Sequence, residues 1–168
     1  RRIGLTGGIA TGKSSVGQFL EQRMGFKVLD ADVYSRQALK PDSSLTRIVV
    51  DRYGEDVLDK SQLNSLTLNR LVLAEIIFSD SLERTWLEKL IHPYVRNCFE
   101  VELSRCRTNV AIVLMIPLLF EASFTDLFSE IWLVSCSLRQ QVNRLVSRDQ
   151  ISVDEALKRI NIQWPIER

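Results

Sequence analysis

Short apolar runs alternate with amphipathic segments along most of the chain. Residues 2–6 are typical of a short buried strand that ends in glycines, and residues 27–30 of a second strand. The apolar, β-branched run at 110–116 is typical of a strand buried on both faces of a parallel sheet, and 131–134 predicts another strand of that kind. Because helical patterns separate these runs, the sequence predicts an α/β domain with a mostly parallel sheet.

Helical periodicity predicts the segments between the strands. Val16, Phe19 and Leu20 share one face of a helix that Gly25 ends, and the apolar stripe at 45–53 predicts another helix. Two more helices are expected late in the chain, one through Val142 and Leu145 and one over 154–160. Strands and helices therefore follow one another as βα units.

A long helical stretch, from about residue 66 to residue 106, precedes the third strand. We expect a second helix of this stretch to begin after a cap at Ser79-Asp80, and a third to begin with Pro93 in its first position. The first helix has an apolar stripe made of Leu71, Ala74, Ile77 and Phe78. The stretch is longer than a simple crossover requires, and no linker rich in Pro, Gly or Ser separates it. It therefore predicts an inserted helical lobe within one domain.

The pattern GxxxxGK[ST] occupies residues 7–14 without a mismatch, between a predicted strand and a predicted helix. Its glycines let backbone N–H groups turn toward phosphate oxygens, Lys13 places a positive charge on the β- and γ-phosphates, and the Ser14 hydroxyl ligates Mg²⁺. The helix adds the positive end of its dipole. The expected nucleotide-binding residues are Gly8, Ile9, Ala10, Thr11, Gly12, Lys13, Ser14 and Ser15. The chain is thus predicted to be a P-loop nucleotide-binding domain.

Three classes of P-loop protein must then be distinguished. A regulatory GTPase needs an NKxD sequence, which does not occur, and a DxxG sequence, whose match at 51–54 ends an amphipathic helix. A mechanical ATPase usually carries an apolar strand that ends in Asp, whereas the run ending at Ile116 continues into Pro117. A small-molecule kinase needs a base near the acceptor hydroxyl and an arginine-bearing lid, and the sequence offers candidates for both.

The candidate base lies in the sequence LDAD, where the second strand ends. Asp30 and Asp32 would face the same way in extended backbone, at the end of the strand where open α/β sheets bind ligands. One carboxylate would accept the proton of a substrate hydroxyl while the other orients the magnesium shell. The alternative is that Asp32 caps a helix that begins at Val33.

The candidate lid carries Arg139, Arg144 and Arg148. Arg144 and Arg148 are i, i+4 on one helix face and could reach the same phosphate group, to which planar guanidinium groups bind bidentately. The alternatives are a solvated basic face, or a surface ion pair with Asp149 that contributes little.

Composition excludes several other classes of protein. The 168 residues fit one domain, and 22 Lys+Arg against 21 Asp+Glu give a net charge of +1, which argues against a general nucleic-acid binder. Three cysteines without a CxxC pair argue against a disulfide framework and for a reducing cytosol, and a single histidine excludes zinc sites built on several imidazoles. No apolar run is long enough for a membrane helix, so we expect no membrane partner.

Together these motifs resemble the dephospho-coenzyme A kinase family over nearly the whole chain. The phosphate loop alone is generic, but the LDAD, IHP and PLLFE blocks in this order are specific. The matching blocks are GLTGGIATGKSS at 4–15, LDAD at 29–32, LEKLIHPYV at 87–95, IPLLFEA at 116–122, RLVSRD at 144–149 and RINIQ at 159–163.

The resemblance implies transfer of the γ-phosphoryl group of ATP, with Mg²⁺, to the ribose 3′-hydroxyl of the small molecule dephospho-coenzyme A, in the cytoplasm. It implies that Asp32 is the general base. The other catalytic residues would be Lys13, Arg144 and Arg148; the metal would be held by Ser14 and Asp30; and the acceptor by Thr6, Asp32, His92, Leu119 and Phe120, with Leu118 and Glu121 beside them. The alternatives are a shikimate- or gluconate-type kinase of the same fold and a non-catalytic nucleotide-binding switch.

Some of these residues have a plain structural alternative. His92 would otherwise be a histidine at a helix break that bonds a backbone carbonyl, and Leu119 and Phe120 would pack in the core. Ala10 and Thr11 replace the Gly-Ser common in the family's loop, and because neither supplies a required charge the expected effect is small.

The resemblance also implies a three-layer P-loop kinase fold in one domain over residues 1–168. The core is expected at about 1–40 and 108–168, the helical acceptor-binding insert at about 60–107, and the lid at about 139–155. Relatives continue past the RINIQ block through a further strand, so the C-terminal part of the family domain is expected to be missing from this chain.

Overall fold

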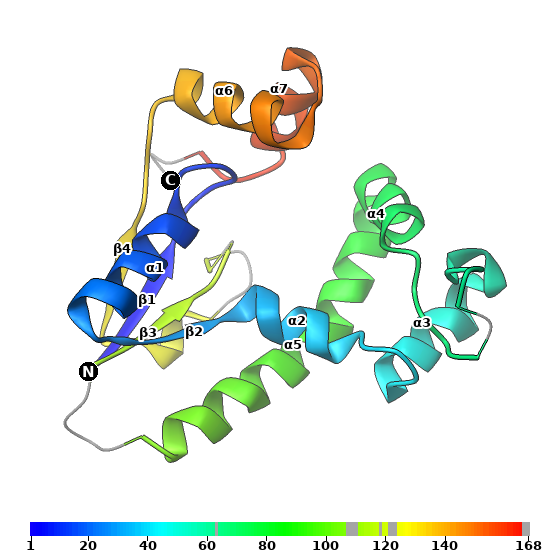
Figure 1. Ribbon diagram of the computed structural model, residues 1–168, viewed down its shortest axis with the longest axis horizontal. Coiled ribbons are helices and arrows are strands. Elements are labelled where there is room, and N and C mark those ends of the chain that lie inside the picture. Colours follow the sequence, from blue (N-terminus) through cyan, green and yellow to red (C-terminus); the bar gives the residue numbers. More distant parts are fainter. Residues whose placement is uncertain (63, 107–110, 118, 121–123, 166–168) are drawn as a thin grey trace. The chain divides into compact units, whose positions relative to one another are not determined.

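The computed structural model describes residues 1–62, 64–106, 111–117, 119–120 and 124–165. The chain divides into two compact units (Figure 1). One, here called the sheet unit, consists of Arg1–Ala31 and Cys106–Arg168; the other, the helical unit, is Asp32–Arg105.

The described residues of the sheet unit form four parallel strands in the order β2-β3-β1-β4 (Figure 1). In chain order they are β1 (Arg2–Thr6), β2 (Lys27–Asp30), β3 (Ile112–Met115) and β4 (Glu130–Leu133). Met115 is in register with Leu5 of β1 and with Asp30 of β2, so these three strands end at the same edge of the sheet. The predicted α/β fold with a parallel sheet is confirmed.

The core of the sheet unit lies between the sheet and α1 (Lys13–Met24). All of β3 is buried, as its β-branched run predicts, and Leu20 of α1 packs on a cluster of Ile3, Leu5, Val113 and Met115. Gly17 lets the helix approach closely, because a Cβ there would lie 3.0 Å from the sulfur of Met115. The left-handed Gly25 ends the helix as expected, but Phe19 is 56% exposed and does not join the buried face.

β4 differs from its prediction. Among the described strands it pairs only with β1, and Trp132 and Leu133 are 37% and 50% exposed, so it is an edge strand and is not buried on both faces. An apolar run indicates a strand, but its position in the sheet depends on neighbours that the run does not specify.

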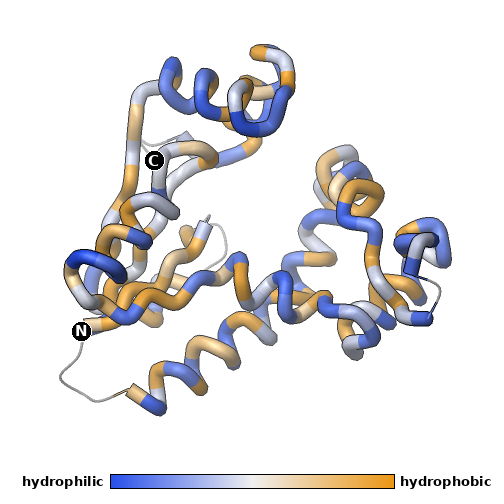
Figure 2. Tube along the Cα trace, viewed as in Figure 1, coloured by the Kyte–Doolittle hydropathy of each residue, from blue (hydrophilic) through white to orange (hydrophobic). Residues whose placement is uncertain are grey.

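Two helices follow β4, namely α6 (Leu138–Asp149) and α7 (Val153–Asn161). Each begins with a capping box, in which a serine side chain accepts from the backbone of the first turn and a Gln or Glu side chain accepts from the backbone of that serine. The serines are Ser137 and Ser152, and their partners Gln140 and Glu155. Figure 2 shows that α6 is largely hydrophilic, and Leu145 is its buried residue.

The helical unit contains α2 (Ala31–Ala38, whose first residue closes the sheet unit), α3 (Ser44–Tyr53), α4 (Arg70–Ser79) and α5 (Ser81–Ser104). A short 3₁₀ turn, η1 (Glu55–Val57), follows α3, and a similar turn in the sheet unit, η2 (Thr125–Leu127), precedes β4. Of the predicted cap residues Ser79 and Asp80, it is Asp80 that caps α5, accepting from the Leu82 N–H at 2.7 Å, and Gly54 ends α3. None of the described helices is long and apolar enough to cross a membrane.

The prediction that Pro93 begins a new helix is wrong. Pro93 lies inside α5, which is continuous from Ser81 to Ser104. A proline within a helix removes one backbone hydrogen bond and crowds the preceding turn. The helix continues because its buried residues, Leu87, Ile91, Val95 and Phe99, recur every four positions on both sides of the proline. Their packing offsets the local defect.

The predicted apolar stripe of α4 is also wrong. Leu71 is 78% exposed and Phe78 is 58% exposed, whereas Leu73 is buried. α4 is apolar around most of its circumference, so the hydrophobic pattern does not single out one face.

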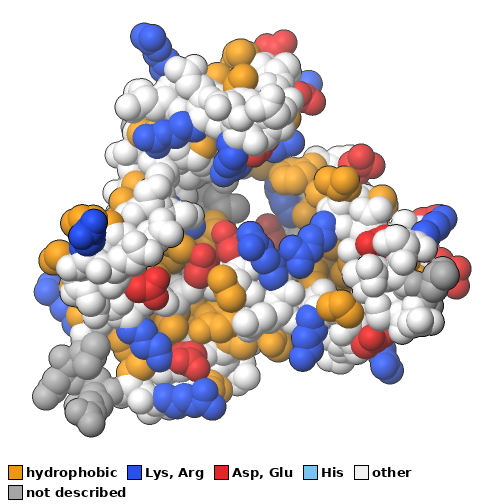
Figure 3. Space-filling model, viewed as in Figure 1, with side chains coloured by type: hydrophobic (Ala, Val, Ile, Leu, Met, Phe, Trp, Pro, Cys, Tyr) orange, Lys and Arg blue, Asp and Glu red, His pale blue; other side chains and the backbone are white. Residues whose placement is uncertain are grey.

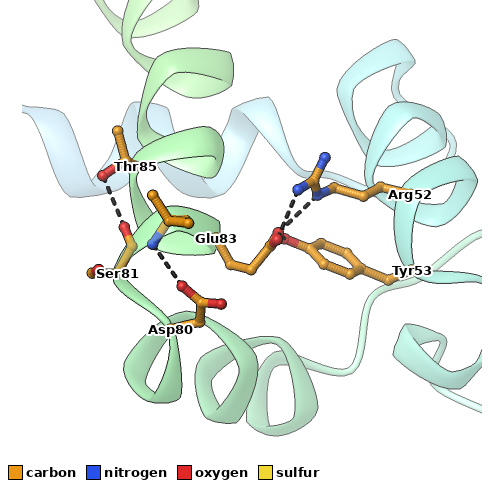
Figure 4. A network of polar contacts seen from close by, with 7 residues as sticks. Arg52, Tyr53, Asp80, Ser81, Glu83 and Thr85 are labelled. Atoms are coloured by element: carbon orange, nitrogen blue, oxygen red, sulfur yellow. Dashed lines mark hydrogen bonds and ion pairs between the residues drawn. The ribbon is translucent and has the colours of Figure 1, made fainter.

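A polar network joins α3 to α5 within the helical unit (Figure 4). The Arg52 guanidinium donates from Nε and Nη2 to the two carboxylate oxygens of Glu83, both at 2.7 Å, and the Tyr53 hydroxyl donates to the same carboxylate at 2.6 Å. Arg52 also lies 4.5 Å from the centroid of the Trp86 ring, a cation–π distance. The network therefore fixes the end of α3 against the start of α5.

This network makes the stability of the protein depend on pH. Hydrogen bonds from Arg52 and Tyr53 lower the pKa of Glu83 from 4.5 to about 2. A lowered carboxyl pKa contributes stability that is present above the unfolded value and is lost as pH falls toward the folded value. We expect Glu83→Gln to lower the melting temperature at pH 7, and the difference from the unsubstituted protein to shrink between pH 4.5 and pH 2.

Glu100→Gln is the matched control, since it removes a carboxylate from an exposed i, i+4 pair with Arg96 on the same helix. Equal losses for the two variants at pH 7, or a Glu83→Gln loss that does not change with pH, would contradict the role assigned to the network.

Candidate active site

The phosphate loop has the predicted strand–loop–helix context. β1 ends at Thr6 and α1 begins at Lys13, with the glycine-rich residues between them. Ala10 and Gly12 have left-handed backbone conformations, with φ of 58° and 104°. Alternation of right- and left-handed residues turns backbone N–H groups into a concave nest that binds anions, and the N-terminus of α1 adds its dipole.

Close contacts hold the first half of this loop. A Cβ at Gly7 would lie 2.5 Å from the carbonyl oxygen of Val134, so only glycine allows this approach. The Thr11 hydroxyl donates to the Gly8 carbonyl at 2.9 Å, and Thr11 is buried. The loop is therefore a packed structure and not an open surface turn.

Ala10 occupies a position where glycine is favoured. A left-handed conformation costs an ordinary residue about 1–2 kcal/mol, whereas glycine adopts it freely but loses more entropy on folding. We expect Ala10→Gly to stabilise the protein by up to about 1 kcal/mol, measured by denaturant unfolding. Ala74→Gly, inside α4, is the control and should destabilise by about 0.5–1 kcal/mol. Destabilisation by both substitutions would contradict strain at Ala10.

Lys13 is the first residue of α1 and is only 9% exposed. No side chain in the described part of the sheet unit forms an ion pair with its ammonium group. Lysine is seldom buried unless an opposite charge meets it. The position thus suits an anion that enters the loop from solution.

The arginines of the expected lid have different partners. Arg144 Nη1 donates to the carbonyl oxygens of Ala10 and Thr11, at 3.1 and 2.9 Å. Arg148 pairs with Asp149, from Nε to Oδ1 at 2.6 Å and from Nη2 to Oδ2 at 3.1 Å, and this contact holds the pKa of Asp149 below its usual value. The two guanidinium groups do not meet at one point here, and the ion-pair alternative holds for Arg148.

The surroundings of these arginines are mixed in charge. Asp149 also accepts from Arg159 of α7 at 3.0 Å, and Arg139 lies exposed in the first turn of α6. Figure 3 shows both basic and acidic side chains in the region of α6 and α7. The alternative of a solvated face fits the exposure of Arg139, Arg144 and Arg148, although acidic side chains lie among them.

Asp30 is the last residue of β2 and lies at the edge of the sheet where β1 enters the loop. It is two strands, or about 10 Å, from β1. It shares a strand face with Val28, whose side chain contacts the core cluster under α1. Asp30 is therefore on the face of the sheet that α1 covers.

Asp32 does not continue the strand. A helix, α2, begins at Ala31 and contains Asp32 in its first turn, where the side chain is exposed. The expectation that extended backbone aims Asp30 and Asp32 in one direction is wrong. The alternative is right that a helix starts here, but it begins at Ala31 and not at Val33, so Asp32 lies inside the first turn and is not its cap. Asp32 is also the first residue of the helical unit, whereas Asp30 belongs to the sheet unit.

The expected acceptor residues are distributed over both units. In the sheet unit Thr6 is buried at the end of β1, and its Oγ1 accepts from the Leu119 N–H at 3.5 Å. Leu119 is fully buried, which fits core packing, whereas Phe120 is 45% exposed and does not fit it. Leu118 and Glu121 lie outside the described residues.

His92 lies in the middle of α5 in the helical unit, so the alternative of a helix-break histidine is wrong. Burial lowers the pKa of its imidazole from 6.5 despite the nearby charge of Glu88, so the ring is mostly neutral at pH 7. A neutral imidazole can donate or accept a hydrogen bond.

A pocket of about 810 Å³ opens beside the phosphate loop within the sheet unit. It is bounded by the loop, the end of β4, the start of α6 and residues 160–165, and its lining includes Phe120, Gln141, Gln163 and Trp164. The sequence prediction did not include the two glutamines or Trp164. The one available signal was the RINIQ block, which ends at Gln163.

No group of three or more His, Cys, Asp or Glu side chains in the described residues is arranged to hold a metal ion. Mg²⁺ is often bound by only one or two protein oxygens together with substrate phosphates and water. The Ser14 hydroxyl, in the first turn of α1, and the Asp30 carboxylate are hard oxygen donors of this kind. Their chemistry fits Mg²⁺.

The family model and two curated relatives of this chain carry the same description. A family model described as dephospho-CoA kinase matches residues 1–168. The dephospho-CoA kinase of Prochlorococcus marinus strain MIT 9313 is 51% identical over all 168 residues, which cover 82% of that protein. The dephospho-CoA kinase of Synechocystis sp. is 46% identical over 166 residues, which are 99% of this chain and 81% of that protein.

Two solved structures are similar in fold. The crystal structure of TT1252 from Thermus thermophilus superposes with a TM-score of 0.81 at 32% identity, covering 99% of this chain and 81% of that one. A dephospho-CoA kinase from Campylobacter jejuni has a TM-score of 0.62 at 24% identity, covering 96% and 79%.

Proposed function

The chain belongs to the dephospho-CoA kinase family, and on that basis we propose that it transfers the γ-phosphoryl group of ATP to the ribose 3′-hydroxyl of dephospho-coenzyme A. The observation that carries the chemistry is the phosphate loop, with its left-handed turns and the buried Lys13 at the start of α1. The family match over the whole chain favours this acceptor over a sugar-acid acceptor and favours catalysis over a nucleotide-binding switch.

The loop would bind the triphosphate of ATP through backbone N–H groups of residues 8–15 and the N-terminus of α1. The N–H groups of Ile9 and Thr11 are the exceptions, because they donate to Gln163 and to the Gly8 carbonyl. The ammonium group of Lys13 would gain the negative partner that its burial favours. Phosphoryl transfer requires mainly positioning and charge stabilisation from the protein. A rigid, positively polarised loop meets both requirements.

Ser14 and Asp30 would hold Mg²⁺, which when bound neutralises charge on the phosphate oxygens. Ser14 lies in the first turn of α1, next to the loop, and Asp30 lies on the face of the sheet that this helix covers. The two residues would therefore orient the phosphate end of the nucleotide.

Asp32 would act as the general base. Its carboxylate would accept the proton of the 3′-hydroxyl while the hydroxyl oxygen attacks the γ-phosphorus. In support, Asp32 is exposed and lies two residues after the end of β2, and the carboxyl end of this strand is at the same edge of the sheet as the phosphate loop. Arg144 and Arg148, on α6, would stabilise the negative charge of the transferring group.

Thr6, His92, Leu119 and Phe120 would contact the acceptor. The exposed ring of Phe120 lines the pocket beside the loop, and a neutral His92 can serve as donor or acceptor toward a polar group of the substrate. Leu119, which is fully buried, would shape this site from within the core.

The proposal is tested by incubating the protein with Mg-ATP and a panel of acceptors and measuring ADP together with the phosphorylated product. We expect ADP and coenzyme A to form with dephospho-coenzyme A, and no product with shikimate or gluconate. Stoichiometric ATP binding without any phosphorylated product would favour the switch. Product from a sugar acid alone would favour the other class of kinase.

A further inference from the structure

We propose that Gln141 and Gln163 are positioning residues that hold the two peptide groups flanking Ile9 and thereby fix the phosphate loop in its anion-binding form. The proposal rests on the phosphate-binding role proposed for this loop. It assigns a task to two neutral side chains that lie far from the loop in sequence, by 132 and 154 residues.

Both glutamines hydrogen-bond directly to the backbone of Ile9, and one accepts whereas the other donates. The backbone N–H of Ile9 donates to Oε1 of Gln163 at 2.7 Å, and Nε2 of Gln141 donates to the carbonyl oxygen of Ile9 at 2.8 Å. Arg144, one turn after Gln141 on α6, donates to the next two carbonyls, those of Ala10 and Thr11. Four consecutive peptide groups of the loop thus hydrogen-bond to side chains from α6 and from just after α7.

Peptide geometry turns these contacts into an orientation of the loop. In a planar trans peptide the C=O and N–H groups point in opposite directions, and the described chain has no cis peptide bond. Because the carbonyls of Ile9 and Thr11 point to α6, the N–H groups of Ala10 and Gly12 point away from it. Both of these residues have the left-handed backbone that forms an anion nest.

Packing leaves the two amide groups little freedom. A Cβ at Gly8 would lie 3.1 Å from Oε1 of Gln163 and 3.3 Å from Nε2 of Gln141, so both groups lie directly over this glycine. Gln141 lies on α6 and Gln163 follows α7, and the two helices are anchored in the core by Leu145 and Ala156, which are fully buried. The hydrogen bonds therefore join the loop to a fixed support.

The opposite sense of the two bonds provides a sharp test. Gln163 must accept a hydrogen bond, which a carboxylate also does, whereas Gln141 must donate one, which a carboxylate cannot do. Gln163→Glu and Gln141→Glu add the same charge beside the same residue, yet only Gln141→Glu removes a bond. Gln140→Glu is the control for charge, because this neighbour on α6 accepts from Ser137 and glutamate preserves that cap.

Two measurements are made on each variant of the full chain. The first is backbone hydrogen exchange of residues 8–12 without nucleotide, and the second is kcat/KM for ATP with dephospho-coenzyme A. We expect Gln141→Glu to raise exchange and to lower kcat/KM, each by about tenfold or more relative to Gln140→Glu, because a misplaced loop loses its alignment. We expect Gln163→Glu to stay within about threefold of the control.

Acidic pH adds a readout that a purely structural role would not change. The carboxyl group introduced by Gln141→Glu regains an O–H donor when it is protonated. The kcat/KM of this variant relative to the Gln140→Glu control should therefore recover as pH falls toward about 5. If Gln141→Glu does not fold, Gln141→Met removes the same donor without a charge and is compared with unsubstituted protein.

The proposal is overturned if Gln141→Glu matches the Gln140→Glu control in hydrogen exchange or, where the unsubstituted protein is active, in kcat/KM. It is also overturned if Gln163→Glu is impaired as much as Gln141→Glu, which would indicate an effect of charge. Hydrogen exchange tests the support of the loop even if the unsubstituted protein transfers no phosphoryl group. An absence of phosphoryl transfer in the unsubstituted protein would overturn the proposed function, but the hydrogen-exchange comparison would still test the support of the loop.

Discussion

Replacing Lys13 by alanine should reduce phosphoryl transfer by a factor on the order of 10² to 10³ or more. The ammonium group lies at the N-terminus of α1 and is largely excluded from water, where a charge acts on phosphate oxygens with little screening. Its interaction strengthens as negative charge develops during transfer, so the loss is expected mainly in kcat. Steady-state kinetics with ATP and dephospho-coenzyme A measure the effect.

Two further variants isolate the charge of Lys13. Lys13→Met keeps most of the apolar side chain and should be as inactive as Lys13→Ala, although it should be at least as stable as the unsubstituted protein. Lys89→Ala, at an exposed position of α5, should leave activity unchanged. Near-normal activity of Lys13→Met would contradict the role of the loop lysine.

The phosphate loop was predictable because each of its fixed residue types answers a chemical requirement. Glycine at position 12 has a φ of 104°, and glycine at position 7 has a carbonyl 2.5 Å from where its Cβ would be. Lys13 supplies charge, and the strand before it and the helix after it follow from ordinary periodicity. The chemical requirements of the loop and the local hydrophobic pattern therefore predict the same strand–loop–helix segment.

The wrong predictions for α4 and α5 concern tertiary packing, which a local sequence pattern does not contain. A proline usually interrupts a helix. At Pro93, however, buried residues recur at every fourth position on both sides, and their packing keeps α5 intact. Leu71 looks like a core residue until the packing of α4 places Leu73 inside. In each case tertiary packing outweighs the residue's own preference.

The support of the loop was beyond sequence reasoning for a similar reason. Gln141 and Gln163 are neutral, follow no spacing rule and meet at Ile9 only because α6 and α7 fold back on the loop. The role of an amide side chain can be assigned only when the backbone group to which it hydrogen-bonds is known. The sequence predicts which residues contact phosphate but not which residues hold those residues in place.

The helix that begins at Ala31 changes how the two aspartates should be viewed. Asp30 ends a strand of the sheet unit, where its position is fixed by the register with Met115. Asp32 begins the helical unit and is carried by α2. One aspartate therefore belongs to the unit that contains the phosphate loop and the other to the helical unit, and the roles proposed for them, metal for Asp30 and acceptor for Asp32, are tested separately.

Asp32→Asn should lower kcat by a factor on the order of 10² to 10⁴, the contribution of a general base, while the dissociation constant of ATP stays unchanged. Asparagine keeps the shape of the side chain and is tolerated in the first turn of a helix, so the variant should fold. Calorimetric titration of ATP and single-turnover kinetics with dephospho-coenzyme A separate binding from the chemical step.

Asp30→Asn is the matched variant, with the same chemical change two residues earlier. If Asp30 orients the metal, its loss should raise the Mg²⁺ concentration needed for half-maximal rate, and excess Mg²⁺ should restore part of the activity. Excess Mg²⁺ should not restore Asp32→Asn, because no metal ion replaces a proton acceptor. A larger loss of kcat in Asp30→Asn that excess Mg²⁺ does not restore would assign the base to Asp30 instead.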